Sequence, residues 1–181
     1  MKILAFAGSN ASKSINRELI NYVLKRFAEH EINFINLKDY ELPLFCTDLI
    51  RNGYPEPAKL FLQQVKECDA IICSLAEHNR SYTVAFKNIL DWVSIISPKV
   101  FQDKPMLLMS ASSVEIGGIN VINEACKFLP IFGANIKETF SFPKFQDNYD
   151  FVEGYILNED ISNELNEKIN SYKEIISEVT V

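Results

Sequence analysis

Short apolar runs alternate with helical patterns along the chain, and this alternation constrains the fold more than any other feature. The run Ala70–Leu75 is apolar at nearly every position, which is typical of a strand buried on both faces. Strands that alternate with helices predict a parallel sheet covered by helices on both sides. The expected strands are 2–7, 31–37, 70–75, 105–111 and 134–139.

The segments between these strands carry apolar residues three and four positions apart, the spacing of one helix face. Segment 82–96 is the clearest, and we expect it to end before Pro98 because the residue preceding a proline disfavours helical geometry. No linker or repeat divides the sequence, so residues 1–181 are predicted to form a single domain. The expected helices are 15–27, 57–67, 82–96, 120–132 and 159–179, with an irregular segment at 38–56.

Charge and cysteine usage exclude several functions. The net charge is −6 and basic residues do not cluster, which argues against a nucleic-acid partner. No apolar stretch reaches the roughly 20 residues that a membrane span needs. Four cysteines without C-x-x-C spacing and only two histidines predict no metal site. The same cysteine usage, with no secretory pattern at Met1, predicts a cytoplasmic protein with reduced thiols.

A polar loop at residues 8–16 lies between the first expected strand and the first expected helix. The unpaired N–H groups at a helix start are a ready site for an anion. A simple helix cap needs one hydroxyl, which Ser14 can supply, so the excess of polar side chains favours a bound phosphate over capping alone. The side chains that add hydrogen-bonding groups are Ser9, Asn10, Ser12, Ser14 and Asn16.

Two further loops belong to the same edge of the expected sheet. Ligands of doubly wound sheets bind beyond the carboxyl ends of the strands, where loops 8–16, 76–82 and 110–118 are expected to meet. Of the six glycines in the chain, Gly8, Gly117 and Gly118 lie in these loops. Glycine lets backbone approach a ligand closely, so we expect one ligand to contact all three loops.

The three loops resemble those of NAD(P)H-dependent FMN reductases with a flavodoxin-like fold. The family motif G-S-x-R-x-x-S-x-N is similar to GSNASKSIN at 8–16. The motif P-E-Y-N-G-S-Y, followed by K-N-x-x-D-W, is similar to AEHNRSY at 76–82 and KNILDW at 87–92. The serine-rich turn with paired glycines is similar to SASSVEIGG at 110–118, and the likeness covers roughly residues 1–145.

This resemblance implies a three-layer α/β fold, doubly wound and flavodoxin-like, with a five-stranded parallel sheet in the order 2-1-3-4-5. It implies an enzyme in which NAD(P)H passes hydride to bound FMN and the electrons go on to a small acceptor. That acceptor would be a flavin, a quinone, an azo compound or a metal oxyanion. The flavin carries the chemistry, so no catalytic side chain is expected. The resemblance also implies a homodimer or homotetramer.

The resemblance assigns site residues by motif position. Ser9, Ser14 and Asn16, with Ile15 between the last two, would hold the FMN phosphate. The segment from Ser112 and Ser113 to Gly117 would close one edge of the flavin ring. The residues that would border the ring from the second loop, largely through backbone groups, are Glu77, His78, Asn79 and Arg80.

Four positions depart from the family motifs. Ala11 stands where the family usually has an arginine, and Lys13 is the cation that would compensate for it. Ala76 replaces a proline, His78 a tyrosine and Arg80 a glycine. The interpretations of Arg80 are a solvated loop cation, a partner for the charge of reduced flavin, or a partner for a phosphate of the nicotinamide cofactor.

Other segments favour structural roles. Lys87 and Asp91 are spaced to pair on a helix surface, and Trp92 lies on its apolar face. The last helix presents a solvated row of glutamates. The aromatic residues Phe140, Phe142, Phe145, Tyr149, Phe151 and Tyr155 show no regular period, so they either pack as an arm over the domain or form a dimer interface.

Three alternative functions share this fold. A flavodoxin-type electron carrier would have a threonine-rich phosphate loop and a strongly acidic face, unlike the Ser/Asn loop and net charge of −6 seen here. A flavin-free binding module stays open because fold alone does not decide function. A phosphorylatable receiver domain would need an aspartate where Leu75 and Ala76 stand and an acidic pair where Gly8 and Ser9 stand.

Overall fold

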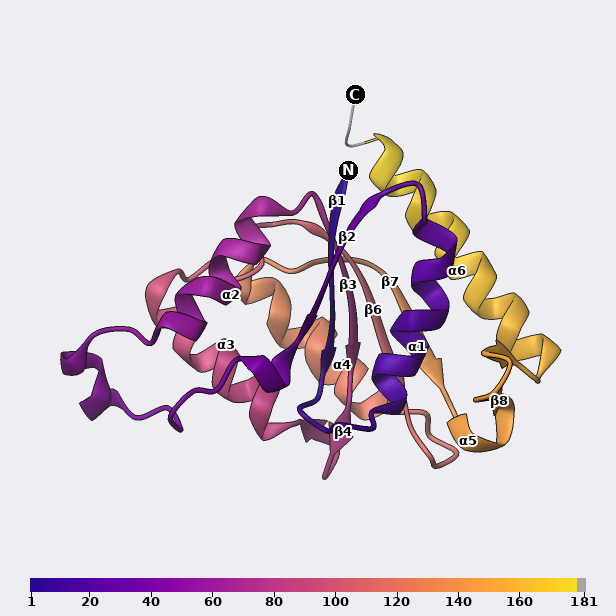
Figure 1. Cartoon of the computed structure of the whole chain (residues 1–181), viewed down its shortest axis with the longest axis horizontal. Helices are drawn as coiled ribbons and strands as arrows, with labels where there is room; N and C mark the ends of the chain where they lie inside the picture. The colour runs from indigo at the N-terminus through magenta and orange to yellow at the C-terminus, as the bar shows by residue number, and fades with distance from the viewer. Residues whose placement is uncertain (179–181) are drawn as a thin grey trace.

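The computed structural model describes residues 1–178 and is built around a five-stranded parallel sheet (Figure 1). The order β2-β1-β3-β6-β7 is the order 2-1-3-4-5 when the strands are counted along the chain, so the predicted topology is confirmed. Ala5 at the middle of β1 pairs with Phe34 on one side and Ile72 on the other. The strands are β1 (Lys2–Gly8), β2 (Glu31–Asn36), β3 (Ala70–Leu75), β6 (Pro105–Ala111) and β7 (Asn135–Phe142).

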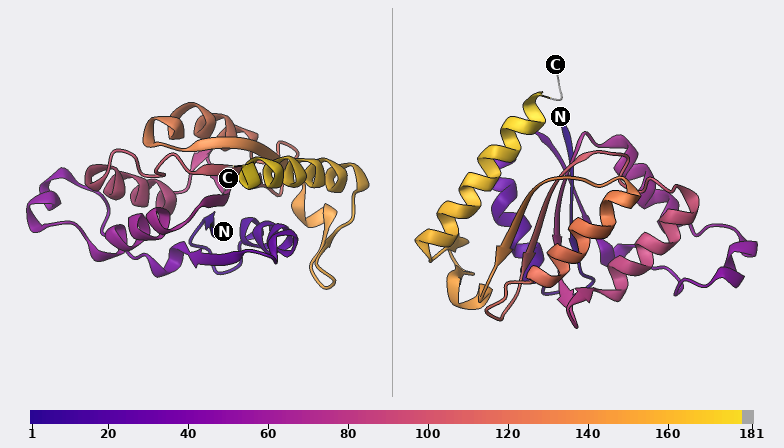
Figure 2. Two further views of the ribbon diagram at one scale, coloured as in Figure 1. Left: turned by 90° about the horizontal axis from the view of Figure 1, so that it is seen from above. Right: turned by 180° about the vertical axis from the view of Figure 1, so that it is seen from behind.

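Helices cover both faces of the sheet, which gives the expected three layers (Figure 2). Alternate side chains of β1 divide between the layers: Leu4 and Phe6 join one core cluster, and Ile3 and Ala5 join the other. Because a strand points successive side chains to opposite faces, β1 and β3 are buried on both sides. One face carries α2 (Glu56–Glu67), α3 (Val84–Ile96) and α4 (Ile119–Phe128), and the other carries α1 (Ile15–Leu24) and α6 (Glu159–Glu178).

The expected helix at 82–96 begins two residues later than predicted. Tyr82 belongs instead to a short antiparallel hairpin, β4 (Glu77–His78) and β5 (Ser81–Tyr82). Thr83 then caps α3, because its side-chain oxygen accepts a hydrogen bond from the N–H of Phe86. The other helix starts lie within one residue of those predicted, and α1 ends in the 3₁₀ turn Lys25–Phe27.

The aromatic C-terminal segment was interpreted wrongly in part. Phe140 and Phe142 are buried residues of β7, which continues three residues beyond its expected end. They lie two positions apart, the spacing of one strand face, but the aromatic residues that follow conceal this period. Phe145 and Tyr149 continue the same core through α5 (Phe145–Asn148) and β8 (Tyr149–Asp150), whereas Phe151 is exposed. The packed-arm interpretation therefore holds for Phe145 and Tyr149, whereas Phe140 and Phe142 belong to the sheet.

The remaining segments are short. The irregular region after β2 contains 3₁₀ turns at Leu37–Asp39 and Thr47–Asn52, and another 3₁₀ turn follows α4 at Leu129–Phe132. The short strand β9 (Tyr155–Ile156) pairs with β8. Val179, expected at the end of the last helix, lies outside the described residues. Within residues 1–178, no helix combines the length and apolar character required to cross a bilayer.

Candidate functional site

The buried polar residues of the described chain gather at one edge of the sheet. Protein interiors hold few polar side chains, and those present are normally hydrogen-bonded for a structural or functional reason. Here they all lie at the carboxyl ends of β1, β3 and β6 or in the adjoining loops, where the three motifs meet. These residues are Ser9, Ser14, Asn16, Ser74, Thr83 and Ser110.

Asn16 joins the polar loop to two strands. Its side-chain oxygen accepts hydrogen bonds from the N–H of Ala111 at 2.8 Å and from the hydroxyl of Ser74 at 2.7 Å. Its amide nitrogen donates to the carbonyl oxygen of Ala111 at 3.1 Å. Asn16 is 2% exposed, so its side chain holds the start of α1 against β3 and β6.

Two hydroxyl groups connect the other loops. Thr83 donates a hydrogen bond to the carbonyl oxygen of Gly8 at 2.8 Å, which ties the start of α3 to the end of β1. Ser110 donates to the carbonyl oxygen of Leu75 at 2.7 Å, which ties β6 to the end of β3. Both hydroxyls are buried, so these hydrogen bonds hold the three loops together at one edge of the sheet.

A cavity of about 280 Å³ opens at the start of α1. Ser14 caps this helix through the N–H of Arg17, but the N–H groups of Ile15 and Asn16 at its first two positions have no partner within residues 1–178. Unpaired amides beside a helix N-terminus are the donors that a phosphate takes. The cavity lining is Ser9, Ala11, Lys13, Ser14, Ile15, Asn16, Ala76, Glu77, His78, Ala111, Ser112, Ser113 and Gln146.

The second loop is a tight hairpin. Asn79 and Arg80 form its two-residue turn with φ of +52° and +67°, the positive values of a type I′ turn. Asparagine suits this turn, whereas a side chain at the second position is strained by about 1 kcal/mol. Neither residue lines the cavity at α1, so this turn stands outside it.

Glu77 connects this hairpin to the third loop. Its carboxylate accepts hydrogen bonds from the N–H of Val121 at 3.0 Å and from the side-chain amide of Asn120 at 3.1 Å. Both donors lie in the first turn of α4, whose N-cap, Gly118, has no side chain to serve as a cap. Glu77 therefore caps α4 from another part of the chain, and its side chain has a positioning role.

Replacing Glu77 with alanine is expected to have a small effect on stability and a larger effect on ligand affinity. Loss of a helix cap lowers the free energy of unfolding by about 1 kcal/mol. If the cavity binds FMN, as the resemblance implies, we expect its dissociation constant to rise about tenfold, because the cap also helps to set the distance between two loops of the cavity. Flavin fluorescence titration of the apo-protein measures this, and an unchanged affinity would separate Glu77 from the site. Glu18→Ala, in the first turn of α1 but outside the cavity lining, is the control.

The third loop is fastened by the segment after β7. The N–H groups of Lys144 and Phe145 donate to the carbonyl oxygens of Val114 and Ser112 at 3.1 and 2.9 Å. The next residue, Gln146, lines the cavity, although no sequence motif pointed to it. Gly117 is buried, and its Cα packs against Ser141 and Pro143, which leave no room for a side chain at this position.

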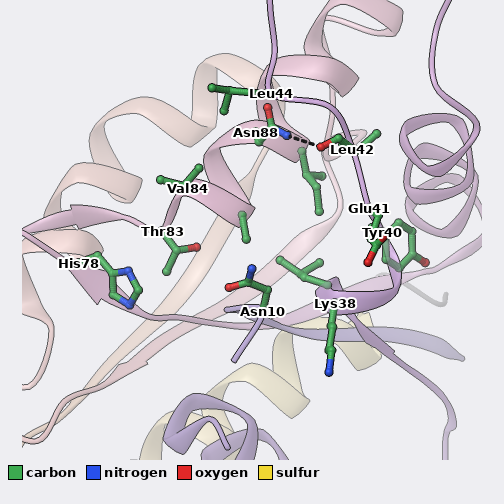
Figure 3. Close-up of a pocket in the computed structure, with 13 residues that line it drawn as sticks. Asn10, Lys38, Tyr40, Glu41, Leu42, Leu44, His78, Thr83, Val84 and Asn88 are labelled. Carbon is green, nitrogen blue, oxygen red and sulfur yellow. Dashed lines mark hydrogen bonds between the residues drawn. The ribbon is translucent and has the colours of Figure 1, made fainter. Parts of the chain in front are cut away.

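A second and larger cavity, of about 620 Å³, lies beside the first (Figure 3). His78 lines both cavities, and Asn10 of the polar loop lines only the larger one. The structure thus brings most of the predicted site residues to one cavity, and places Asn79, Arg80 and Gly117 outside both linings. Asn10, expected from the sequence to add a hydrogen-bonding group to the phosphate loop, lines the larger cavity instead, together with Thr83, which the sequence did not assign to the site.

Comparison with known proteins identifies the family of this chain. Residues 1–147 match the family model described as NADPH-dependent FMN reductase. The chain belongs to this family. An NADPH:quinone oxidoreductase of Arabidopsis thaliana is 30% identical over 167 residues, which cover 88% of this chain and 83% of the relative. A 2-hydroxy-1,4-benzoquinone reductase of a Burkholderia species is 28% identical over 176 residues, covering 95% and 94%.

Solved structures support the fold of this FMN reductase family member. FerB of Paracoccus denitrificans, a flavoenzyme NAD(P)H:(acceptor) oxidoreductase, superposes with a TM-score of 0.75 and 23% identity, covering 98% of this chain and 97% of FerB. The residues present fit the cofactor that the family implies. Free amides at the start of α1 suit its phosphate, and the hairpin and third-loop residues that continue the same cavity suit its planar ring.

Proposed function

We propose that this protein binds FMN in the cavity at the start of α1 and uses NAD(P)H to reduce small aromatic acceptors. The observation that carries the proposal is the continuity of that cavity, which runs from the free amides of Ile15 and Asn16 to His78 and Ser112. FMN bound there supplies the redox chemistry, since it accepts hydride from a nicotinamide and passes electrons to a second substrate.

The side chains of this protein bind and orient the cofactor. Ser9 and Ser14 would border the phosphate of FMN. Lys13, on the same lining, would supply the positive charge that the family's arginine provides at the position of Ala11. Ser112 and Ser113 would border the far edge of the flavin ring, and the backbone of Glu77 and His78 would flank it. Arg80, exposed on the strained turn, is free to contact an anion at the mouth of the site.

Quinones are the acceptors that we propose. This rests on the names of the two relatives above, an NADPH:quinone oxidoreductase and a 2-hydroxy-1,4-benzoquinone reductase. Two apolar side chains beside the third loop, Ile116 and Ile119, are exposed and suit the docking of an apolar ring. The proposed setting is a cytoplasmic homodimer, and the same exposed side chains favour a protein contact beside the cavity.

Reconstitution with FMN tests the proposal directly. Apo-protein should bind FMN at one per chain and then oxidise NADH or NADPH in the presence of a benzoquinone. Riboflavin, which lacks the phosphate, should bind at least 100-fold more weakly than FMN. A protein that binds neither flavin would refute the proposal, and equal affinity for both flavins would remove the phosphate from the cavity at α1. Flavin that exchanges only single electrons would identify an electron carrier instead.

A further inference from the structure

The larger cavity is distinct from the one proposed to hold the FMN phosphate. Its volume of about 620 Å³ is more than twice that of the cavity at α1, and the two share only His78. It lies between the segment after β2 and the first turns of α3 (Figure 3). A flavin ring that His78 borders would therefore have the larger cavity beside it.

We propose that this cavity binds the adenosine half of the nicotinamide donor; this rests on the function proposed above. A quinone needs little more space than the ring on which it reacts. A dinucleotide also carries a second nucleoside and a pyrophosphate, which must lie beyond the reacting ring. Cavities that bind small molecules span roughly 300–1,000 Å³. The larger cavity is within that range, whereas the cavity at α1, at about 280 Å³, is just below it, so the two adjoining cavities together would hold the flavin and the donor.

The cavity wall matches the chemistry of that ligand. Leu42, Leu44 and Val84 offer apolar surface for a planar base, and Tyr40 lies at the back of the cavity. Leu44 and Val84 are 72% and 69% exposed, so their apolar surface is not used in the core. An adenine ring would cover this surface and remove it from water.

The polar groups around the cavity are free to bind a phosphate and sugar. The side chains of Asn10, Lys38 and His78 have no hydrogen-bond partner within residues 1–178, and no carboxylate lies within 4.0 Å of the Lys38 ammonium in that part of the chain. Lys38 can therefore pair with a phosphate. Glu41, also on the lining, is an acceptor for ribose hydroxyls.

The wall is held in place before any ligand arrives. Asn88 donates to the carbonyl oxygen of Pro43 at 3.1 Å and accepts from the N–H of Phe45 at 2.8 Å. The indole N–H of Trp92 donates to the same carbonyl oxygen at 2.7 Å. Asn88 and Trp92 thus fasten residues 42–45 to α3, and a preformed wall avoids the entropy loss of ordering a loop on binding.

Binding of ADP-ribose to the FMN-loaded protein tests the proposal. ADP-ribose carries the adenosine half and pyrophosphate without the nicotinamide ring. We expect it to bind in calorimetry and to compete with NAD(P)H. Lys38→Glu and Val84→Trp should each weaken its binding at least fivefold. Lys66→Glu, an equal charge change on an exposed lysine of α2 that lines neither cavity, should leave the affinity within twofold.

A donor without the adenosine half separates this role from general damage. Lys38→Glu and Val84→Trp should raise the KM for NAD(P)H relative to the unchanged protein. The factor by which they raise the KM for N-benzyl-dihydronicotinamide should be at least five times smaller. Equal rises with both donors, or no binding of ADP-ribose to the FMN-loaded protein, would overturn the proposal. Titration of each apo-variant with FMN is measured first. If FMN fails to bind, the proposed function fails, whereas normal FMN binding without ADP-ribose binding refutes only the donor site.

Discussion

Replacing Asn16 with alanine will lower the free energy of unfolding by about 3 kcal/mol and abolish tight FMN binding. The substitution removes three hydrogen bonds at a site that is 2% exposed. It leaves the hydroxyl of Ser74 and both backbone groups of Ala111 buried without these partners. Each unsatisfied buried group costs about 1–3 kcal/mol, and local repacking recovers part of the total.

Urea unfolding of the apo-protein measures the first effect as a lower midpoint with an unchanged slope. Flavin titration below the transition measures the second, because the start of α1 loses its attachment to β6. Asn21→Ala is the matched control, since Asn21 lies on the same helix with an exposed side chain whose one hydrogen bond within residues 1–178 is to Glu18. If Asn16→Ala changed stability no more than Asn21→Ala, the network would have no energetic role.

Replacing Gly118 with alanine will lower the free energy of unfolding by a similar amount, about 3 kcal/mol. Gly118 has φ of +81°, where alanine is strained by about 1–2 kcal/mol. An added Cβ would also lie 2.0 Å from the hydroxyl oxygen of Ser110 and 2.8 Å from its Cβ. Ser110 is fully buried and hydrogen-bonded to Leu75, so it cannot move away without breaking that bond. Such overpacking costs about 1–3 kcal/mol.

The substitution Gly133→Ala distinguishes the cost of backbone strain from the cost of overpacking. Its φ and ψ of +79° and 22° match the +81° and 22° of Gly118, but the contacts of an added Cβ would be looser: the flexible side chain of Lys99 at 3.1 Å, and the backbone nitrogen and carboxylate of Asp103 at 3.3 Å. Gly133→Ala should therefore lower the free energy of unfolding by only about 1 kcal/mol. FMN affinity should fall at least tenfold in Gly118→Ala and stay unchanged in Gly133→Ala. Equal losses of stability in both variants would show that Ser110 yields to the added atom.

The sequence predicted the existence and order of the five strands more accurately than the residues at which they begin and end. Ala70–Leu75 was identified to the residue because both of its faces are buried, so apolar character begins and ends with the strand. β7 was predicted to end three residues too early, because the aromatic residues that follow Phe142 conceal the two-residue period of Phe140 and Phe142. Tyr82 was assigned to a helix because an aromatic residue at the right spacing fits a helix face as well as a hairpin.

The candidate site was predicted in its loops but less completely in its side chains. The polar loop, the hairpin and the serine-rich turn do meet, and seven residues that the motifs assigned lie with Glu77 around one cavity. The direction of a side chain is set by its neighbours in three dimensions. Asn16 therefore turns into the protein toward Ser74 and Ala111, and Glu77 reaches α4, 43 and 44 positions along the chain.

The sequence alone determined the layer architecture and the edge that carries the site. Both follow from local patterns, because the alternation of strand and helix periods sets a parallel sheet and the loops after its strands must share one edge. The tertiary structure alone decided that Gln146 reaches the cavity and that a larger cavity adjoins it beside His78. These contacts join segments far apart in the chain, and their distances depend on how helices pack on the sheet, which no local pattern encodes.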